Sequence, residues 1–186
     1  MQLYLIRHPR PINAEGLCYG RHDIAVAAES VARAAAAVRD LIPGRVLEGA
    51  RFYSSPASRC ALLARALAAP REPSMAEELW EMSFGSWEGQ AWDCLPRDEL
   101  DAWARDVWRY RPGGAESAAM VASRWQRWVR ALRFCGDEAA IAVTHAGVIR
   151  VALVAAGVLD AAVFLQAPVE FGSVHRVDLA QAQVSA

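Results

Sequence analysis

Short apolar runs alternate with longer helical stretches along this chain. The runs at residues 3–6, 50–54 and 139–144 have strand length, and the last is continuous enough for a buried parallel strand. A further run at 173–179 alternates in character and is expected near an edge of the sheet. Because helical stretches separate the strands, the pattern predicts an α/β fold, a three-layer α/β/α sandwich with a mostly parallel central sheet.

Five segments carry helical periodicity, and the clearest runs from Ser117 to Arg133. Its apolar stripe consists of Val121, Trp125, Trp128 and Leu132. Four arginines lie on the opposite side of this predicted helix and are interpreted as a solvated face: Arg124, Arg127, Arg130 and Arg133. The other predicted helices cover about residues 28–42, 57–69, 98–110 and 148–156.

Two local patterns predict the structure around residues that could take part in catalysis. Ser54-Ser55-Pro56 predicts a helix start with serine as the cap and proline in the first turn, and this helix carries Arg59 near its beginning. Residues 79–89 mix tryptophan and phenylalanine with glutamate and glycine. A loop or distorted segment fits them better than a strand.

Composition narrows the class of protein. The 186 residues predict a single domain over 1–186, with 54% hydrophobic and 22% charged residues, as in a soluble globular protein. The net charge of −1 gives no support to a nucleic-acid partner. The first apolar run is too short for a signal peptide or a membrane span, so we expect a cytoplasmic protein with no membrane partner. The four cysteines form no CxxC pair and are expected to be reduced thiols: Cys18, Cys60, Cys94 and Cys135.

The candidate catalytic and phosphate-binding residues lie where the predicted strands end. The first strand runs into Arg7 and His8, and then Pro9 and Pro11 stop it, because proline fixes φ and donates no backbone hydrogen bond. Arg59 follows the second strand, and His145 follows the strand at 139–144. Since the carboxyl ends of parallel strands meet at one edge, these residues are expected to converge there. Each histidine alone is more often a hydrogen-bonded structural residue.

Phosphate chemistry requires these residue types together. Arginine forks bind and neutralise the oxygens of a phosphoryl group, and a neutral imidazole can attack phosphorus. The leaving alcohol then needs a proton, which a carboxylic acid can donate. Glu81, between Trp80 and Met82, has suitable neighbours, although composition alone favours an exposed loop carboxylate.

Four motifs in order resemble the histidine phosphatase superfamily, the phosphoglycerate mutase-like group. They are Arg7-His8, Ser55-Pro56 with Arg59, the segment 79–89, and Val143-Thr144-His145-Ala146-Gly147. The resemblance implies that His8 is the phosphorylated nucleophile and that Arg7 and Arg59 bind the phosphate. It implies that Glu81 is the proton donor, and that His145 holds the transferring group and stabilises its charge. It implies no metal and no other cofactor.

The loop at residues 16–23 and the compact length look like the α-ribazole phosphatase branch of cobalamin synthesis. The first loop departs from the family pattern: Pro9 stands at the usual glycine, Pro11 at the usual threonine and Ala14 at the usual asparagine. A segment at 112–117 resembles a family stretch near the substrate mouth, but Ala115 interrupts it, so Glu116 and Ser117 are left outside the predicted site.

The leading hypothesis is a metal-independent phosphomonoesterase that acts on the small phosphorylated substrate α-ribazole 5′-phosphate through a phosphohistidine. A broad-specificity small-molecule phosphatase is the near alternative. A phosphoglycerate mutase is less favoured, because mutases of the family tend to be longer. A non-catalytic phospholigand-binding module would be free to lose His8, Glu81 or His145, and all three are present. Exposed tryptophans could form a homodimer interface, but core packing explains them equally.

Overall fold

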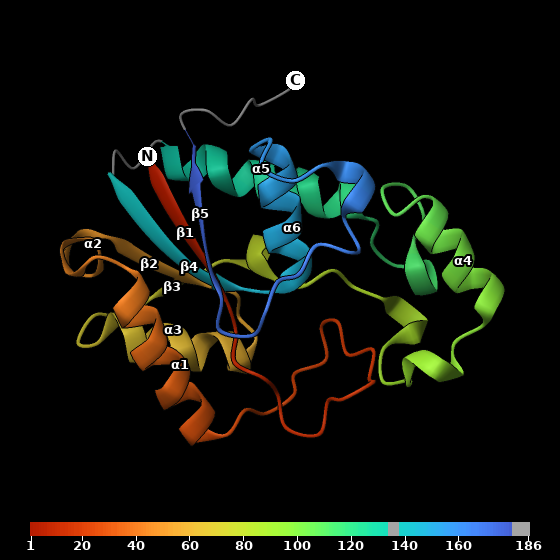
Figure 1. The fold of residues 1–186 in the computed structure, drawn as a ribbon, viewed down its shortest axis with the longest axis horizontal. Helices are drawn as coiled ribbons and strands as arrows, with labels where there is room; N and C mark the ends of the chain where they lie inside the picture. Colours follow the sequence, from red (N-terminus) through yellow and green to blue (C-terminus); the bar gives the residue numbers. More distant parts are fainter. Residues whose placement is uncertain (134–137, 180–186) are drawn as a thin grey trace.

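A five-stranded sheet forms the centre of the computed structural model, which describes residues 1–133 and 138–179 (Figure 1). The strand order is β3-β2-β4-β1-β5, and only β5 runs antiparallel to its neighbour among the described strands. The strands are β1 (Gln2–Arg7), β2 (Arg51–Ser54), β3 (Ser74–Met75), β4 (Ala139–Thr144) and β5 (Val174–Asp178). The four predicted strands are confirmed to within two residues, and the two-residue β3 was not predicted.

The register of the parallel strands brings their carboxyl ends to one level. Arg7 at the end of β1 pairs with Thr144 at the end of β4, so the residues that follow, His8 and His145, leave neighbouring strands together. Ser54 at the end of β2 pairs with Val143, one residue earlier in β4. The convergence predicted from topology therefore has a direct cause in strand pairing.

Helices cover both faces of the sheet, as predicted (Figure 1). On one face, α1 (Ala28–Leu41) and α3 (Ser58–Ala68) share a core with alternate residues of β1 and β4, including Tyr4 and Ile141. On the other, α5 (Ala118–Arg133) and α6 (Ala146–Ala155) share a core with the intervening residues, including Leu3 and Ala140. Both faces of the strands are thus apolar, which explains their continuous hydrophobic runs.

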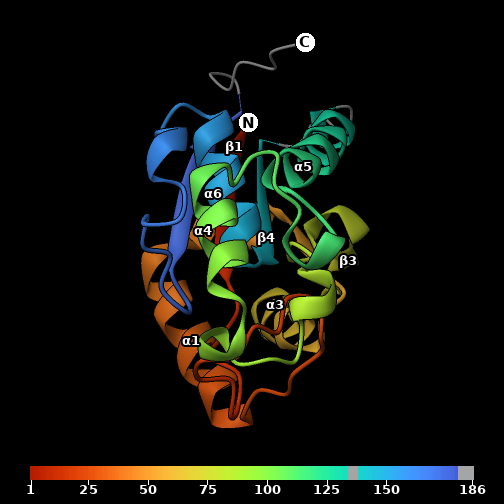
Figure 2. The ribbon, with the colours of Figure 1, turned by 90° about the vertical axis from the view of Figure 1, so that its right-hand side faces the viewer.

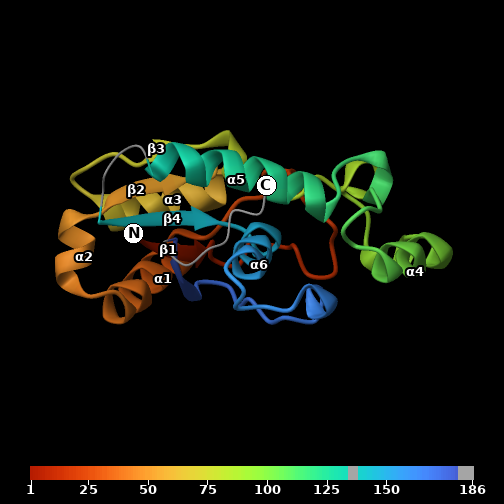
Figure 3. The same ribbon diagram turned by 90° about the horizontal axis from the view of Figure 1, so that it is seen from above.

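A segment that includes α4 (Arg97–Arg105) extends beyond the sheet, on the side toward which β4 points (Figure 3). Figure 2 looks at the molecule from that side and shows α4 in front of α6. This segment, called the cap here and covering residues 84–110, shares a small core with the loop after β1, formed by the buried Trp87, Leu95 and Cys18. The remaining short helices are α2 (Gly44–Gly49) and the 3₁₀ turns Glu77–Leu79, Gly85–Trp87, Trp92–Cys94, Pro112–Gly114 and Ala161–Val163. Within the described residues, no helix has the length and apolarity that crossing a bilayer requires.

The end of α4 and the start of α3 differ most from the sequence-based prediction. The helix predicted for residues 98–110 ends at Arg105, because Asp106 leaves helical geometry at φ −143° and its carboxylate accepts the N–H of Arg109. The predicted serine cap of α3 is wrong, since Ala57 occupies the N-cap position and makes no side-chain cap. Instead Asp23, from the loop after β1, accepts both the N–H and the hydroxyl of Ser58 at 2.9 Å.

Candidate active site

The two histidines that follow β1 and β4 face each other at the carboxyl edge of the sheet. The ring centroids of His8 and His145 are 5.1 Å apart. Arg59, from the first turn of α3, places its Nη2 3.5 Å from Nδ1 of His145. All three side chains are buried. Residues separated by as many as 137 positions in the sequence are therefore brought into one cluster.

His8 is held as a neutral imidazole with a defined tautomer. Its Nδ1 lies 2.7 Å from the carbonyl oxygen of Pro9, which can only accept, so Nδ1 carries the proton. Burial lowers the pKa of His8 to about 3, and the positive charges of Arg59 and Arg7 act in the same direction. Nε2 consequently keeps its lone pair, which is the requirement for nucleophilic attack.

The guanidinium of Arg59 is oriented by the loop after β1. It donates to the carbonyl oxygens of His22 and Gly20, each at 2.8 Å, and lies 3.5 Å from the carboxylate of Asp23. Arg7 donates to the carbonyl of Val169 and stacks on Phe171. In the described part of the chain, Nε of Arg59 and Nε of Arg7 are buried without a hydrogen-bond partner. Leaving such donors unpaired is costly, so they favour an anionic ligand at this site.

His145 is buried between Ser55, Cys60 and Trp80. Since Arg59 approaches Nδ1 as a donor, the proton resides on Nε2, which donates to Oγ of Ser55 at 2.8 Å. The ring stacks on Trp80 with a centroid distance of 6.4 Å and an interplanar angle of 6°. Burial, followed by the charges of His8 and Arg59, lowers the pKa of His145 well below its ordinary value. Burial also raises the pKa of the adjacent Cys60 thiol, which excludes a thiolate as a competing nucleophile.

Glu81 lies against the N-terminus of α6, the helix that begins directly after His145. Its Oε1 accepts the N–H of Met82 at 2.9 Å, and its Oε2 accepts the N–H of Gly147 at 3.3 Å. A Cβ at Gly147 would lie 2.4 Å from Oε1, so a larger residue there would displace the Glu81 carboxylate. The alternative of an exposed loop carboxylate is excluded, because Glu81 is only partly exposed.

A cavity of about 340 Å³ joins the strand edge to the cap. Arg7, Glu81 and Tyr19 line its polar side. Aromatic rings of the cap and of the segment before β5 line another part of it: Phe84, Trp92, Trp103 and Phe171. Three further charged side chains line it as well: Arg10, Glu15 and Arg150. Hydrogen bonds tie the cap to the first loop, from the N–H of Trp92 to the carbonyl of Gly16 at 2.8 Å and from Cys18 to Gln90 at 2.9 Å. The loop after β1 and the cap thus form one wall.

Comparison with known families decides the class of protein. Residues 3–185 match the family described as "Histidine phosphatase superfamily (branch 1)". The chain belongs to that superfamily. No curated protein matches the sequence.

Solved structures of other proteins share the fold. The Thermus thermophilus protein TTHB049 has a TM-score of 0.73 at 30% identity, with 96% of this chain and 94% of that chain covered. A phosphoglycerate mutase from the same organism has a TM-score of 0.74 at 30% identity and the same coverage. A phosphoserine phosphatase mutant from Entamoeba histolytica, in complex with phosphoserine, has a TM-score of 0.80 at 18% identity, with 94% and 89% covered, and shows the fold alone.

One of the unusual residues of the first loop lies at the cavity in this superfamily member. Ala14 lines the cavity, so a methyl group faces it where the family usually has asparagine. Asn13 is exposed and has a left-handed φ of +54°. Arg10, two residues after His8, lies over Phe171 with its Cζ 4.7 Å from the ring centroid and also lines the cavity.

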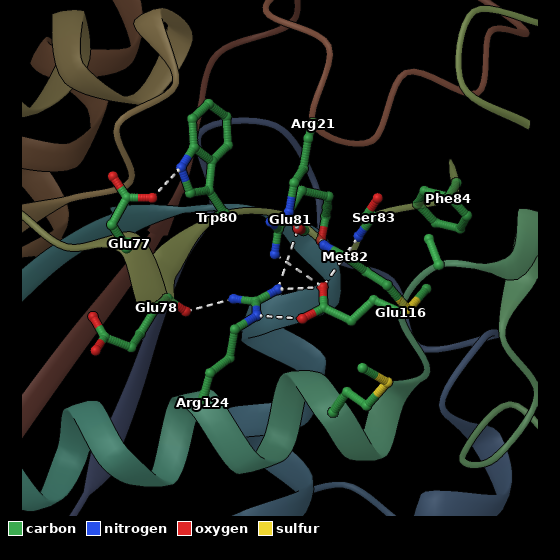
Figure 4. A network of polar contacts seen from close by, with 12 residues as sticks. Arg21, Glu77, Glu78, Trp80, Glu81, Met82, Ser83, Phe84, Glu116 and Arg124 are labelled. Carbon is green, nitrogen blue, oxygen red and sulfur yellow. Dashed lines mark hydrogen bonds and ion pairs between the residues drawn. The ribbon is translucent and has the colours of Figure 1, made fainter. Parts of the chain in front are cut away.

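Sequence reasoning missed a polar network behind Glu81, formed by Arg21, Glu116 and Arg124 (Figure 4). The prediction that Arg124 lies on a solvated face is wrong, because its side chain is only 7% exposed and bonded to Glu116. Arg127 and Arg130 are exposed as predicted; the side chain of Arg133 and the whole of Cys135 lie outside the described part of the chain. A signal existed: at about 100° per residue, position 124 falls only about 60° from Val121, at the border of the apolar stripe.

The depressed histidine pKa values predict acid destabilisation. The folded-state pKa of His8 is below its unfolded value of 6.5, so its stabilising contribution is present above pH 6.5 and is lost as pH falls toward 3. Between pH 7.5 and pH 5, His8 alone is expected to remove about 2 kcal/mol, and His145 acts in the same direction. Urea unfolding at the two pH values, in phosphate-free buffer, measures this change in the free energy of unfolding. His8→Gln should reduce the difference between the two pH values by about that amount, and an unchanged difference would contradict the assignment.

Proposed function

We propose that this chain is a metal-independent phosphomonoesterase that forms a phosphohistidine on His8. The observation that carries the proposal is the state of His8: a buried neutral imidazole with Nε2 unprotonated, next to the cationic Arg7 and Arg59. A neutral nucleophile beside two guanidiniums suits attack on a phosphate dianion, because the cations offset the charge that repels other nucleophiles.

The reaction takes two steps. In the first, Nε2 of His8 forms a bond to phosphorus while the bond from phosphorus to the alcohol oxygen breaks, and protonated Glu81 transfers its proton to that oxygen. In the second, water attacks the phosphohistidine, and its proton returns to the Glu81 carboxylate. The Nε2–P bond breaks, the electron pair stays on Nε2, and inorganic phosphate leaves.

His145 and the two arginines hold the transferring group. Arg59 is fixed by the first loop, and its neighbour His145 is fixed by Ser55 on the Nε2 side. His145 is neutral without substrate. A bound phosphoryl group supplies negative charge that favours protonation of His145, so this side chain adds positive charge where the transition state needs it.

For the substrate we propose α-ribazole 5′-phosphate, as a cytoplasmic step of cobalamin biosynthesis. The support is the aromatic wall of the cavity. Phe84, Trp92 and Trp103 are packed edge-to-face or stacked within the cap, and all three line the space next to Glu81. Flat faces of this kind favour an alcohol that carries an aromatic base over a small aliphatic one.

One observation favours a second candidate. Arg10 and Arg150 line the same cavity as Arg7, so more cations face it than one phosphate requires. Such a cavity suits a small phosphorylated acid with a carboxylate, and the names of two related structures contain phosphoglycerate mutase and phosphoserine phosphatase. The second candidate is therefore a phosphatase or mutase for such acids.

A substrate panel in the presence of a chelator separates these proposals. Phosphate release is measured from α-ribazole 5′-phosphate, mononucleotides, 3-phosphoglycerate, phosphoserine and an aryl phosphate, together with interconversion of phosphoglycerate isomers. We expect kcat/KM for α-ribazole 5′-phosphate to exceed the others by at least about 100-fold. Comparable low rates on all would indicate a generalist phosphatase, and preference for the acids would favour the second candidate. Neither release nor isomerisation, with no label on His8, would indicate a binding module.

A further inference from the structure

We infer that Arg21 and Arg124, held by Glu116, are positioning residues that fix the backbone of Glu81. The inference rests on the proposed role of Glu81 as proton donor. It concerns residues outside the predicted catalytic set, and it assigns a task to the buried ion pair behind the site.

Two guanidiniums from different elements converge on one backbone carbonyl (Figure 4). Nε of Arg21, in the loop after β1, donates to the carbonyl oxygen of Glu81 at 3.1 Å. Nη2 of Arg124, in α5, donates to the same oxygen at 3.2 Å. Residues 81–84 belong to no helix or strand, so side-chain donors replace the hydrogen bonds that regular structure would supply.

Glu116 joins the two arginines to the same loop. Its Oε1 accepts from Nε of Arg124 at 2.8 Å, and its Oε2 accepts from Nη2 of Arg124 at 3.0 Å. The Oε2 atom also accepts from Arg21 at 3.2 Å and from the N–H of Ser83 at 3.1 Å. Arg124 additionally donates to the carbonyl of Glu78. The backbone is therefore fixed before Glu81, at Glu81 and after it.

The network is a stiff support because it is buried and charged. The side chains of Arg124 and Glu116 are 7% and 11% exposed, whereas that of Arg21 is 39% exposed. Burial opposes ionisation of Glu116, but hydrogen bonding and charge from Arg124, then the Ser83 N–H and Arg21, outweigh it and lower the pKa of Glu116. Charge-assisted bidentate bonds fix direction as well as distance.

Direction matters at Glu81 because its carboxylate has little freedom. It bridges the N–H groups of Met82 and Gly147, and the glycine allows this close approach. A proton donor displaced by about 1 Å loses on the order of 100-fold in rate. Loosening the carbonyl of Glu81 should therefore impair proton donation before it impairs phosphate binding, which depends on Arg7 and Arg59.

The test compares leaving groups in the first turnover, for Arg21→Gln and Arg124→Gln. Alcohol release from an alkyl phosphate needs the proton, whereas an activated aryl phosphate does not. We expect about 10- to 100-fold slower release from the alkyl ester, and aryl release and KM within about threefold of wild type. In the Glu81→Gln background, either arginine substitution should cause little further loss. Arg127→Gln, one turn along α5 and exposed, is the matched control and should change neither rate.

Equal losses on both esters, or losses that multiply with that of Glu81→Gln, would overturn the inference and leave a purely structural ion pair. If Arg124→Gln does not fold, Arg21→Gln decides the question, because its side chain is more exposed and lies outside the helices and strands. Failure of the proposed function is a separate result, because in that case the wild-type protein itself forms no phosphohistidine. A leaving-group effect in Glu81→Gln without one in the arginine variants would refute only the positioning role.

Discussion

His8→Ala should lower kcat for any phosphomonoester by at least about 10⁴-fold, because it removes the atom that forms the bond to phosphorus. Arg7, Arg59 and His145 remain in this variant, so substrate should still bind with an affinity near that of wild type. A loss confined to kcat, with binding retained, distinguishes a missing nucleophile from a damaged phosphate site.

The measurement is covalent labelling with a radioactive phosphomonoester, followed by quenching. Wild type should acquire a label that is stable to base and labile to acid, and His8→Ala should acquire none. His175→Gln is the matched control: this histidine is on β5, bonded to Ser173 and outside the cluster, so its variant should label as wild type does. Residual turnover above about 1% in purified His8→Ala would rule out His8 as the nucleophile.

The part of this site that the sequence predicts is the part that strand topology controls. Arg7-His8 and His145 follow apolar runs, and the parallel pairing of β1 with β4 brings these ends to the same level. Pro9 marks the end of the first strand without any reference to the rest of the chain. The family match supports the same assignment for the fold. The catalytic roles of these residues stay predictions until the variants are measured.

Apart from the position of Arg124 at the border of its apolar stripe, the support behind Glu81 could not be predicted, because it depends on contacts between segments that no local pattern connects. Arg21 and Glu116 come from two loops and Arg124 from α5, and no spacing in the sequence relates the three residues. The burial of Arg124 follows from the position of the loop 78–83 over α5, which is a tertiary arrangement. The same holds for the start of α3, where Asp23 acts as the cap from 35 residues away.

The aromatic wall illustrates a different limit. The sequence leaves the tryptophans of the cap open between an exposed interface and core packing, and Trp87 is buried. Trp92 and Trp103 instead line the cavity, where they stack on each other with an interplanar angle of 7°. Periodicity reports which residues are apolar, but whether an apolar ring faces a core or a ligand depends on how the cap is placed over the sheet.

Glu81→Gln should slow the first turnover of an alkyl phosphate by about 10²- to 10⁴-fold, while the first turnover of an activated aryl phosphate changes by less than about tenfold. The amide keeps the size of the carboxylate and can accept one of its two backbone N–H bonds, but it cannot supply the proton to the alkoxide. An aryl alcohol leaves as a stable anion and does not need that proton. A burst of aryl alcohol should therefore survive in this variant.

The second step of the reaction, hydrolysis of the phosphohistidine, provides a second test of the role of Glu81. After the burst, water must attack the phosphohistidine, and without the Glu81 carboxylate to accept its proton, the labelled enzyme should accumulate and decay slowly. Rapid-quench measurement of alcohol and label together records both steps. Glu72→Gln removes an exposed carboxylate that is paired with Arg65, and this variant should behave as wild type. Equal losses for alkyl and aryl esters, with no accumulated label, would exclude Glu81 as the proton donor and direct attention to another acid at the cavity.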